Sequence, residues 1–201
     1  SHLYLCIAGE LAAVICIHDP LRREARDAVA ALHACGIGKV VMMTGDNRQT
    51  AQAVAREVGV DAVYAEVLPE DKAAFIRSEK AAGHTVIMVG DGVNDSPALS
   101  EADAGVAIST GAAIAREIAD ITIASEDLFE LVTLRRLSQA LMARIHRNYR
   151  FIVGFNLSLI LLGVAGLLPP TTSALLHNMS TLGISLRNMT DLLDDEENPR
   201  K

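Results

Sequence analysis

Three short polar clusters in the sequence combine the residue types that can bind a phosphate group and a divalent cation. A hydroxyl beside a tight turn can bind phosphate oxygens, an ammonium can offset their charge, and paired carboxylates can hold Mg²⁺, which prefers oxygen ligands. Together, such groups stabilise phosphoryl transfer electrostatically. The clusters are Thr44-Gly45-Asp46-Asn47, Lys72 shortly after Pro69-Glu70-Asp71, and Gly90-Asp91-Gly92-Val93-Asn94-Asp95. One cluster alone would indicate a turn, because Asp-Gly pairs are common turn formers, whereas three in this order favour a catalytic site.

The segments around these clusters predict strands alternating with helices. Short apolar runs predict strands at 40–43, 62–64, 85–89, 104–108 and 121–124. Helical periodicity and glycine stops predict helices at 21–35, 50–58, 69–82, 97–102 and 114–118. Apolar strands that alternate with helices are typical of a doubly wound, mostly parallel α/β sheet covered on both faces. Ligands of such sheets bind beyond the carboxyl ends of the strands, where the polar clusters fall.

The two ends of the chain have a different character. Residues 3–7 and 11–17 are apolar runs around Ala8-Gly9-Glu10, which predicts a β-hairpin. Residues 128–150 form a long arginine-rich helical stretch, and the apolar run 151–168 has a length that suits a transmembrane helix. After Pro169-Pro170, residues 171–189 are a weaker candidate for a second span. We therefore expect a transmembrane helical hairpin after the sheet, or alternatively a soluble hairpin packed on the sheet domain.

The polar residues of the second candidate span are ordered along the helix. They recur at every fourth position, which stacks them on one face that neighbouring helices could cover. These residues are Ser173, His177, Thr181 and Ser185. Basic residues before the first span and after the second predict that both ends lie on the cytoplasmic side. The formal net charge of −7 argues against a nucleic-acid partner, which would need clustered Lys and Arg.

The clusters resemble the phosphorylation-domain motifs of P-type ATPases, which belong to the haloacid dehalogenase superfamily. The matching segments are 43–47 with Thr50-Ala51, 67–72, and 88–99, and Asp19-Pro20-Leu21-Arg22 resembles the hinge between the nucleotide-binding and phosphorylation domains. The resemblance implies that residues 1–18 end a nucleotide-binding domain and that 19–126 form the phosphorylation domain. Residues 127–201 would be a linker helix, two transmembrane helices and an acidic tail.

The resemblance also implies a role for each matching residue. Thr44 and Gly45 would bind the phosphoryl group, and Asp46 would support their loop. Lys72 would bridge the phosphate and the catalytic aspartate. Asp91 would ligate Mg²⁺, with Asn94 and Asp95 ordering the site and Asp95 as a second candidate Mg²⁺ ligand. The implied cofactors are Mg²⁺ and ATP.

Two spans after the phosphorylation domain resemble the heavy-metal subclass of P-type ATPases. The resemblance implies that His177, Asn156, Met179 and Thr181 contact the transported ion. Imidazole suits Zn, Cu, Ni or Co, and methionine sulfur suits Cu(I), so the ion stays open among these and Cd or Mn. The same polar groups could instead form hydrogen bonds between helices.

The sequence lacks the Asp-Lys-Thr-Gly-Thr motif that carries the nucleophile in this family. We therefore expect the C-terminal part of an ATP-driven transition-metal transporter, inactive without the N-terminal part of the same protein. Such a protein would be integral to the cell membrane, with its phosphorylation domain in the cytoplasm. The alternatives are a haloacid dehalogenase-like phosphatase and a non-catalytic, membrane-anchored module for metal binding or regulation.

Overall fold

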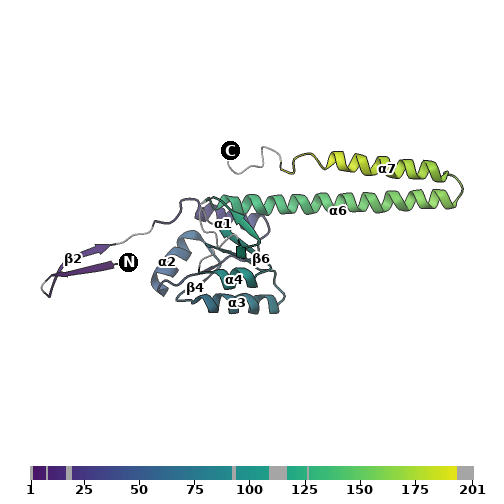
Figure 1. Ribbon diagram of the computed structural model, residues 1–201. Coiled ribbons are helices and arrows are strands. Elements are labelled where there is room, and N and C mark those ends of the chain that lie inside the picture. The colour runs from purple at the N-terminus through teal and green to yellow at the C-terminus, as the bar shows by residue number, and fades with distance from the viewer. Residues whose placement is uncertain are drawn as a thin grey trace. The chain divides into compact units, whose positions relative to one another are not determined.

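The computed structural model describes the backbone of residues 2–7, 9–16, 20–91, 94–108, 117–125 and 127–193 (Figure 1). The chain divides into two compact units, Ser1–His33 with Ile37–Leu128, and Ala34–Gly36 with Phe129–Lys201. The predicted helix at 114–118 falls mostly outside the described residues, because only its last two positions belong to them.

The first unit begins with the predicted hairpin. Strands β1 (His2–Ile7) and β2 (Glu10–Cys16) pair in antiparallel fashion, with Gly9 at φ 84° in the turn between them. This φ lies in the left-handed region, which residues with a side chain adopt only at an energetic cost, so a glycine is favoured at this position. Apolar side chains of both strands, including Tyr4 and Ile7, are exposed. A two-stranded ribbon with exposed apolar side chains is marginally stable by itself.

Helices and parallel strands then alternate, which confirms the predicted α/β class. The elements are α1 (Ala25–Ala34), β3 (Val41–Met43), α2 (Arg48–Val58), β4 (Ala62–Tyr64), α3 (Pro69–Ala81), β5 (Ile87–Gly90), α4 (Ser96–Glu101), β6 (Ala104–Ile108) and β7 (Ile121–Ile123). Their most buried side chains include Ala51, Ile76, Leu99 and Val106. The core of the unit thus lies where the helices pack on the strands.

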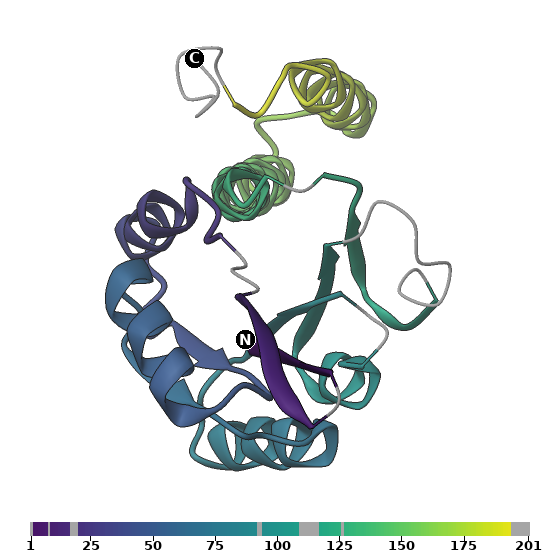
Figure 2. The same cartoon turned by 90° about the vertical axis from the view of Figure 1, so that its left-hand side faces the viewer.

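The strands pair in two separate groups. Strand β3 pairs with β4, and β5, β6 and β7 pair in that order, all of them parallel. Figure 2 shows the blue strands of the first group apart from the teal strands of the second. Within the described residues, β3 and β5 therefore each use only one edge for hydrogen bonds with a neighbouring strand.

Helix α3 is tied to both groups of strands. Lys80 Nζ donates to the carbonyl of Glu101 at 2.7 Å and lies 3.4 Å from Asp103 Oδ1. Asp103 in turn accepts from the backbone N–H of Val86 at 2.8 Å, and this bond lowers the pKa of the Asp103 carboxyl. These contacts fix α3 to the segments that precede β5 and β6.

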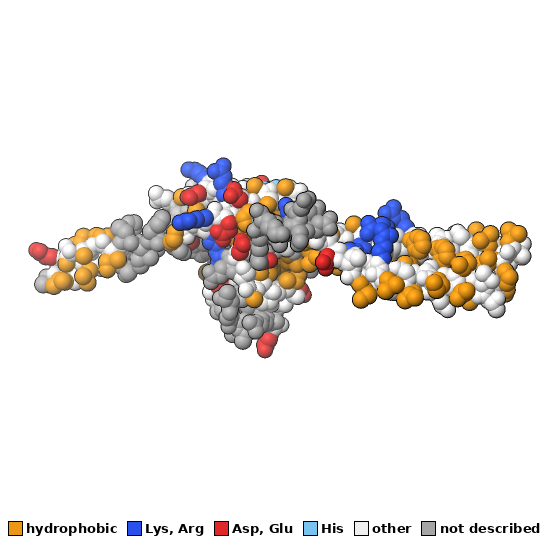
Figure 3. Space-filling view, turned by 90° about the horizontal axis from the view of Figure 1, so that it is seen from above, with side chains coloured by type: hydrophobic (Ala, Val, Ile, Leu, Met, Phe, Trp, Pro, Cys, Tyr) orange, Lys and Arg blue, Asp and Glu red, His pale blue; other side chains and the backbone are white. Residues whose placement is uncertain are grey.

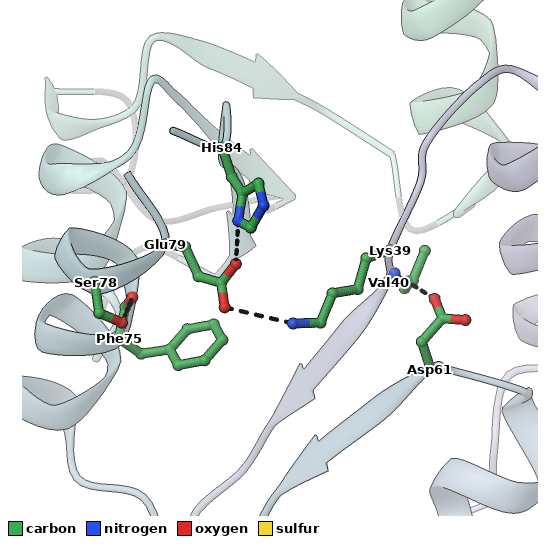
Figure 4. A network of polar contacts seen from close by, with 7 residues as sticks. All are labelled: Lys39, Val40, Asp61, Phe75, Ser78, Glu79 and His84. Carbon is green, nitrogen blue, oxygen red and sulfur yellow. Dashed lines mark hydrogen bonds and ion pairs between the residues drawn. The ribbon is translucent and has the colours of Figure 1, made fainter. Parts of the chain in front are cut away.

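The other attachment of α3 is a polar network near the amino end of β3 (Figure 4). Lys39 Nζ donates to Glu79 Oε1 at 3.4 Å, and Glu79 Oε2 lies 2.7 Å from His84 Nδ1. The hydrogen bond with His84 is the largest cause that lowers the pKa of Glu79, and Lys39 adds to it. Next to Lys39, the N–H of Val40 donates to Asp61 Oδ2 at 2.6 Å. This network lies at the amino end of β3, opposite the carboxyl end, which Thr44 follows.

The second unit is a helical hairpin. Helix α6 (Phe129–Val164) and helix α7 (Pro170–Arg187) pack together, and Leu159 of α6 is buried. Helix α6 runs through the boundary predicted at residue 150, since that point has no helix-breaking residue. Pro170 occupies the first turn of α7, where its missing N–H costs no hydrogen bond.

Within the described residues, no helix combines the length and the apolar character needed to cross a membrane. The predicted transmembrane hairpin is thus seen as a helical hairpin but is not confirmed as membrane-spanning. Helix α6 ends at Val164, four residues before the predicted end of the span at 168. At about 1.5 Å per residue, its part from residue 151 rises roughly 21 Å, against a hydrocarbon core of roughly 30 Å.

Gly105 in β6 allows a close approach of α4, and this contact generates a first prediction. A Cβ atom at Gly105 would lie 2.7 Å from the carbonyl oxygen of Leu99, which is backbone and cannot rotate away. We expect Gly105→Ala to lower the free energy of unfolding by about 1–3 kcal/mol, the usual cost of overpacking. Urea denaturation measures this change.

The matched control is Gly38→Ala, since nothing lies within 4 Å of a Cβ atom at Gly38. Equal stability of the two alanine variants would contradict the close packing of α4 on β6.

Candidate functional site

The loop after β3 orients the hydroxyl of Thr44. Thr44 Oγ1 donates to Asp46 Oδ2 at 2.9 Å and accepts from the N–H of Asp46 at 3.1 Å. Asn47 then caps α2, because its Oδ1 accepts from the N–H of Thr50 at 2.9 Å. A reciprocal pair of bonds and a helix cap hold the loop in one conformation, and Asp46 supports Thr44 directly.

Backbone hydrogen bonds join this loop to the segment that leads into α3. The N–H of Val67 donates to the carbonyl of Thr44 at 3.1 Å, and the N–H of Glu66 donates to the carbonyl of Asp46 at 2.9 Å. Glu66 adopts φ 57°, a left-handed conformation that is uncommon for a residue with a side chain. Residue 45 also lies here, since a Cβ atom on Gly45 would be 3.9 Å from the carbonyl of Val67. The first and second polar clusters are therefore neighbours.

Lys72 lies in the first turn of α3 and reaches the third cluster. Pro69 begins the helix, and Asp71 Oδ2 accepts from the N–H of Leu68 at 3.3 Å. Lys72 Nζ donates to Asp95 Oδ1 at 2.6 Å, and each side chain is only 14% exposed. The ion pair thus links α3 to the segment between β5 and α4, in a largely buried position.

Gly90, the last residue of β5, makes room for Asp95. A Cβ atom on Gly90 would lie 2.6 Å from Asp95 Oδ2 and 2.9 Å from its Cβ. Any side chain at position 90 would push the carboxylate away from Lys72. Sequence reasoning had assigned no role to Gly90, although its place directly before Asp91 was a usable signal.

The structure groups the predicted catalytic residues into two contacting pairs, Thr44 with Asp46 and Lys72 with Asp95. Asp91 directly follows β5, so it stands at the same end of that strand, and Asn94 is exposed. Gly92 and Val93 lie outside the described residues. The carboxyl ends of β3 and β5 therefore carry Thr44 and Asp91 respectively, and Lys72 contacts the segment that follows β5.

The carboxylates of Asp91 and Asp95 fit a Mg²⁺ site only if waters and phosphate oxygens complete the set of ligands. Across the part of the chain that is described, no three or more Asp, Glu, His or Cys side chains gather as a metal site would require. Mg²⁺ keeps several waters and takes phosphate oxygens, so one or two carboxylates suffice. Asp91, directly after β5, stands where such a carboxylate is expected, and Asp95 holds the Lys72 ammonium. The contact with Lys72 favours a positioning role for Asp95.

In the second unit, the predicted ion-contacting residues lie partly together. His177 Nδ1 lies 2.9 Å from Asn156 Oδ1, so the two side chains link α7 to α6. Thr181 Oγ1 donates to the carbonyl of His177 at 3.1 Å, and the Met179 side chain is 59% exposed. The Asn156–His177 contact agrees with both earlier interpretations, a ligand pair and a hydrogen bond between helices.

Comparison with known proteins identifies the class to which this fold and site belong. A family model described as haloacid dehalogenase-like hydrolase matches residues 2–103. The chain belongs to the haloacid dehalogenase-like hydrolases.

Its relatives are P-type ATPases of heavy metals. It is 46% identical over 176 residues to a copper-transporting ATPase 2 of Rhizobium meliloti, covering 88% of this chain and 21% of that protein. It is 40% identical over 183 residues to a manganese-exporting P-type ATPase of Mycobacterium tuberculosis, covering 90% and 26%. The chain therefore spans about a fifth to a quarter of the length of these relatives.

Solved structures agree with this relationship. A zinc-transporting PIB-type ATPase in the E2.Pi state superposes with a TM-score of 0.80 and 31% identity, covering 89% of this chain and 29% of that one. The catalytic CPx-ATPase domain CopB-B gives a TM-score of 0.54 and 29% identity, covering 66% and 53%.

The ion pair between Lys72 and Asp95 generates a second prediction. A double-mutant cycle with Lys72→Met and Asp95→Asn should give a coupling energy of about 1–3 kcal/mol, because a charge-assisted bond of low exposure is broken. Urea denaturation of the two single variants and the double variant measures this coupling.

The exposed pair Arg77–Glu101, with 3.1 Å between Arg77 Nη1 and Glu101 Oε2, is the control. A cycle on that pair should give less than about 1 kcal/mol. A coupling for Lys72 and Asp95 as small as the control would contradict the assigned link.

Proposed function

We propose that the chain is the C-terminal part of an ATP-driven transporter of a transition-metal ion that works through an aspartyl-phosphate intermediate. One observation carries the proposal: Lys72 pairs with Asp95 beside β5, while backbone bonds join the Thr44 loop to the segment just before Lys72. The relatives support it, because proteins named copper-transporting and manganese-exporting ATPases align with about nine tenths of the chain.

Each side chain has a physical role in such a reaction. The Thr44 hydroxyl, oriented by Asp46, would donate to a phosphoryl oxygen, and the turn at Gly45 would leave room for the group. The Lys72 ammonium would offset the negative charge that develops during transfer. Asp91 would hold Mg²⁺, which supplies charge neutralisation when bound, and Asp95 would keep Lys72 in place. Asn94 would order the same segment.

The nucleophilic aspartate would come from another segment of the same protein. Within the described residues, β3 and β5 each have an edge without a strand partner, and Ile87 and Val89 of β5 are 46% and 38% exposed. Unpaired parallel edges with exposed apolar side chains are suited to receive an additional strand. We propose that an Asp-Lys-Thr-Gly-Thr segment of the N-terminal part pairs here, and that ATP binds to that part and to the hairpin of residues 1–18.

The hairpin of α6 and α7 would be the membrane part. Residues 151–186 contain no Asp, Glu, Lys or Arg, and many of their apolar side chains, such as Val164 and Leu175, are exposed. Exposed apolar surface of this extent is suited to lipid or to further helices of the same protein. The sheet unit would then lie in the cytoplasm, and Asn156, His177, Met179 and Thr181 would line the path of the ion.

A third prediction tests the catalytic assignment in the intact protein. Asp91→Ala should lower metal-stimulated phosphate release from ATP by at least about a hundredfold, because the carboxylate would hold the cation that neutralises the reacting phosphate. Phosphate release from purified full-length protein measures this loss. Asp27→Ala, an exposed acidic residue of α1, is the matched control. Unchanged turnover in Asp91→Ala, with the control also unchanged, would refute the role.

A fourth prediction concerns the ion itself. His177→Ala should change which of Cu⁺, Zn²⁺, Co²⁺ and Mn²⁺ stimulates ATP hydrolysis, or should weaken the stimulation, because an imidazole ligand would be lost. His146→Ala is the control, since its ring Nδ1 lies 2.8 Å from the carbonyl of Met142 on its own helix. An identical metal profile and affinity in His177→Ala would leave His177 with the helix-linking role alone.

A further inference from the structure

Exposed arginines gather at one level of the helical hairpin. Arg147 and Arg150 lie one turn apart on α6, and Arg187 is the last residue of α7. Asn148 Nδ2 donates to Asn188 Oδ1 at 2.8 Å, which places the end of α7 beside this part of α6. We refer to Arg147, Arg150 and Arg187 as the arginine band.

Arg144, one turn before Arg147 on α6, already forms hydrogen bonds within the protein. Arg144 donates to the carbonyls of Thr190 at 2.7 Å and Asp191 at 2.6 Å, just beyond the end of α7. A guanidinium in this position satisfies free carbonyl oxygens and complements the helix dipole. Among the described residues, the guanidinium groups of the arginine band have no such partner, so they are available to an external anion.

The surface beyond the band is uncharged. No Asp, Glu, Lys or Arg occurs from Phe151 to Leu186, and Val164, near the far end of α6, is 84% exposed. Figure 3 shows the blue basic side chains at one level and orange apolar side chains beyond them. Tyr149 and Phe151 are exposed at the border between the two regions. Aromatic side chains between a basic and an apolar zone are typical of the interface between water and lipid.

We propose that the arginine band binds the phosphodiester groups of acidic phospholipids at a bilayer surface. A guanidinium presents a planar fork of donors that matches a phosphate, and an anionic leaflet attracts clustered arginines. Free phosphate offers the same chemistry, but only a lipid also covers the apolar side chains that begin at Phe151. The proposal rests on the membrane location given above for the hairpin, and it adds a lipid class to it.

Binding of the full 201-residue chain to sedimenting vesicles tests the proposal. One set contains phosphatidylcholine alone, and the other contains phosphatidylcholine with phosphatidylglycerol. The wild type should bind the acidic vesicles more tightly, and added salt should reduce the difference. The triple variant R147Q/R150Q/R187Q should bind acidic vesicles on the order of 10- to 100-fold more weakly, with unchanged binding to neutral vesicles. Circular dichroism checks that the variant keeps its helices.

The control variant R26Q/R48Q/R56Q removes the same number of charges from exposed positions of the sheet unit, and it should bind as the wild type does. Equal affinity of the wild type for both kinds of vesicle would overturn the lipid preference and leave the membrane location intact. Absence of binding to either kind would overturn the membrane location together with the preference. Equal weakening by both triple variants would assign the effect to net charge and refute a role for the band. Competition by inorganic phosphate at low millimolar concentration would show that the band binds free phosphate and would also refute the proposal.

Discussion

Helix α3 is attached at both of its ends, and the arrangement of the site depends on that constraint. At its start, Lys72 binds Asp95 in the segment after β5. Towards its end, Lys80 contacts the segment before β6, and Glu79 binds Lys39 just before β3. The two groups of strands share no hydrogen bonds within the described residues, so α3 supplies connections that the strands do not.

The Lys72–Asp95 pair also sets the electrostatics of the site. Both side chains are largely removed from water, and an ammonium in such a position needs a counter-charge. The Asp95 carboxylate supplies this counter-charge. An incoming phosphate would therefore find Lys72 already neutralised, and it would gain most if it could share the ammonium with Asp95. Gly90 leaves the room that the Asp95 carboxylate needs, and the ion pair with this carboxylate orients the ammonium before any phosphate arrives.

Local patterns predicted most elements because the deciding interactions were local. The strands at 62–64 and 104–108 have the predicted bounds, since an acidic residue, Asp61 or Asp103, directly precedes each short apolar run. Helix α2 begins two residues earlier than predicted, because Asn47 caps it in place of a later residue. Helix α1 begins only at Ala25, four residues after the predicted start at residue 21.

Features that depend on contacts between distant segments could not be predicted from local sequence patterns. The division of the strands into two groups depends on hydrogen bonds between distant segments, which apolar runs do not encode. The pairing of Lys72 with Asp95, 23 positions apart, was not expected, because the resemblance to known motifs implied a link between Lys72 and a catalytic aspartate of another segment. The packing of Gly90 on Asp95 was not foreseen either. In the hairpin, the change in hydropathy predicted a boundary at residue 150, but helix α6 continues to Val164. The backbone hydrogen bonds of a helix do not depend on whether its side chains are polar or apolar.

The polar groups of the hairpin show how one geometry can serve two purposes. In the proposed membrane location, an unpaired imidazole or amide would be costly, so the Asn156–His177 contact would stabilise the pairing of α6 with α7. The same contact orients the imidazole, because a ring nitrogen held by a neighbour leaves the other nitrogen directed elsewhere. The hydroxyls of Ser180 and Thr181 donate to the carbonyl of His177, so they add no second partner for its ring. A metal ion would therefore meet a histidine that is already oriented, and removal of Asn156 would disturb that orientation as well as the helix pairing.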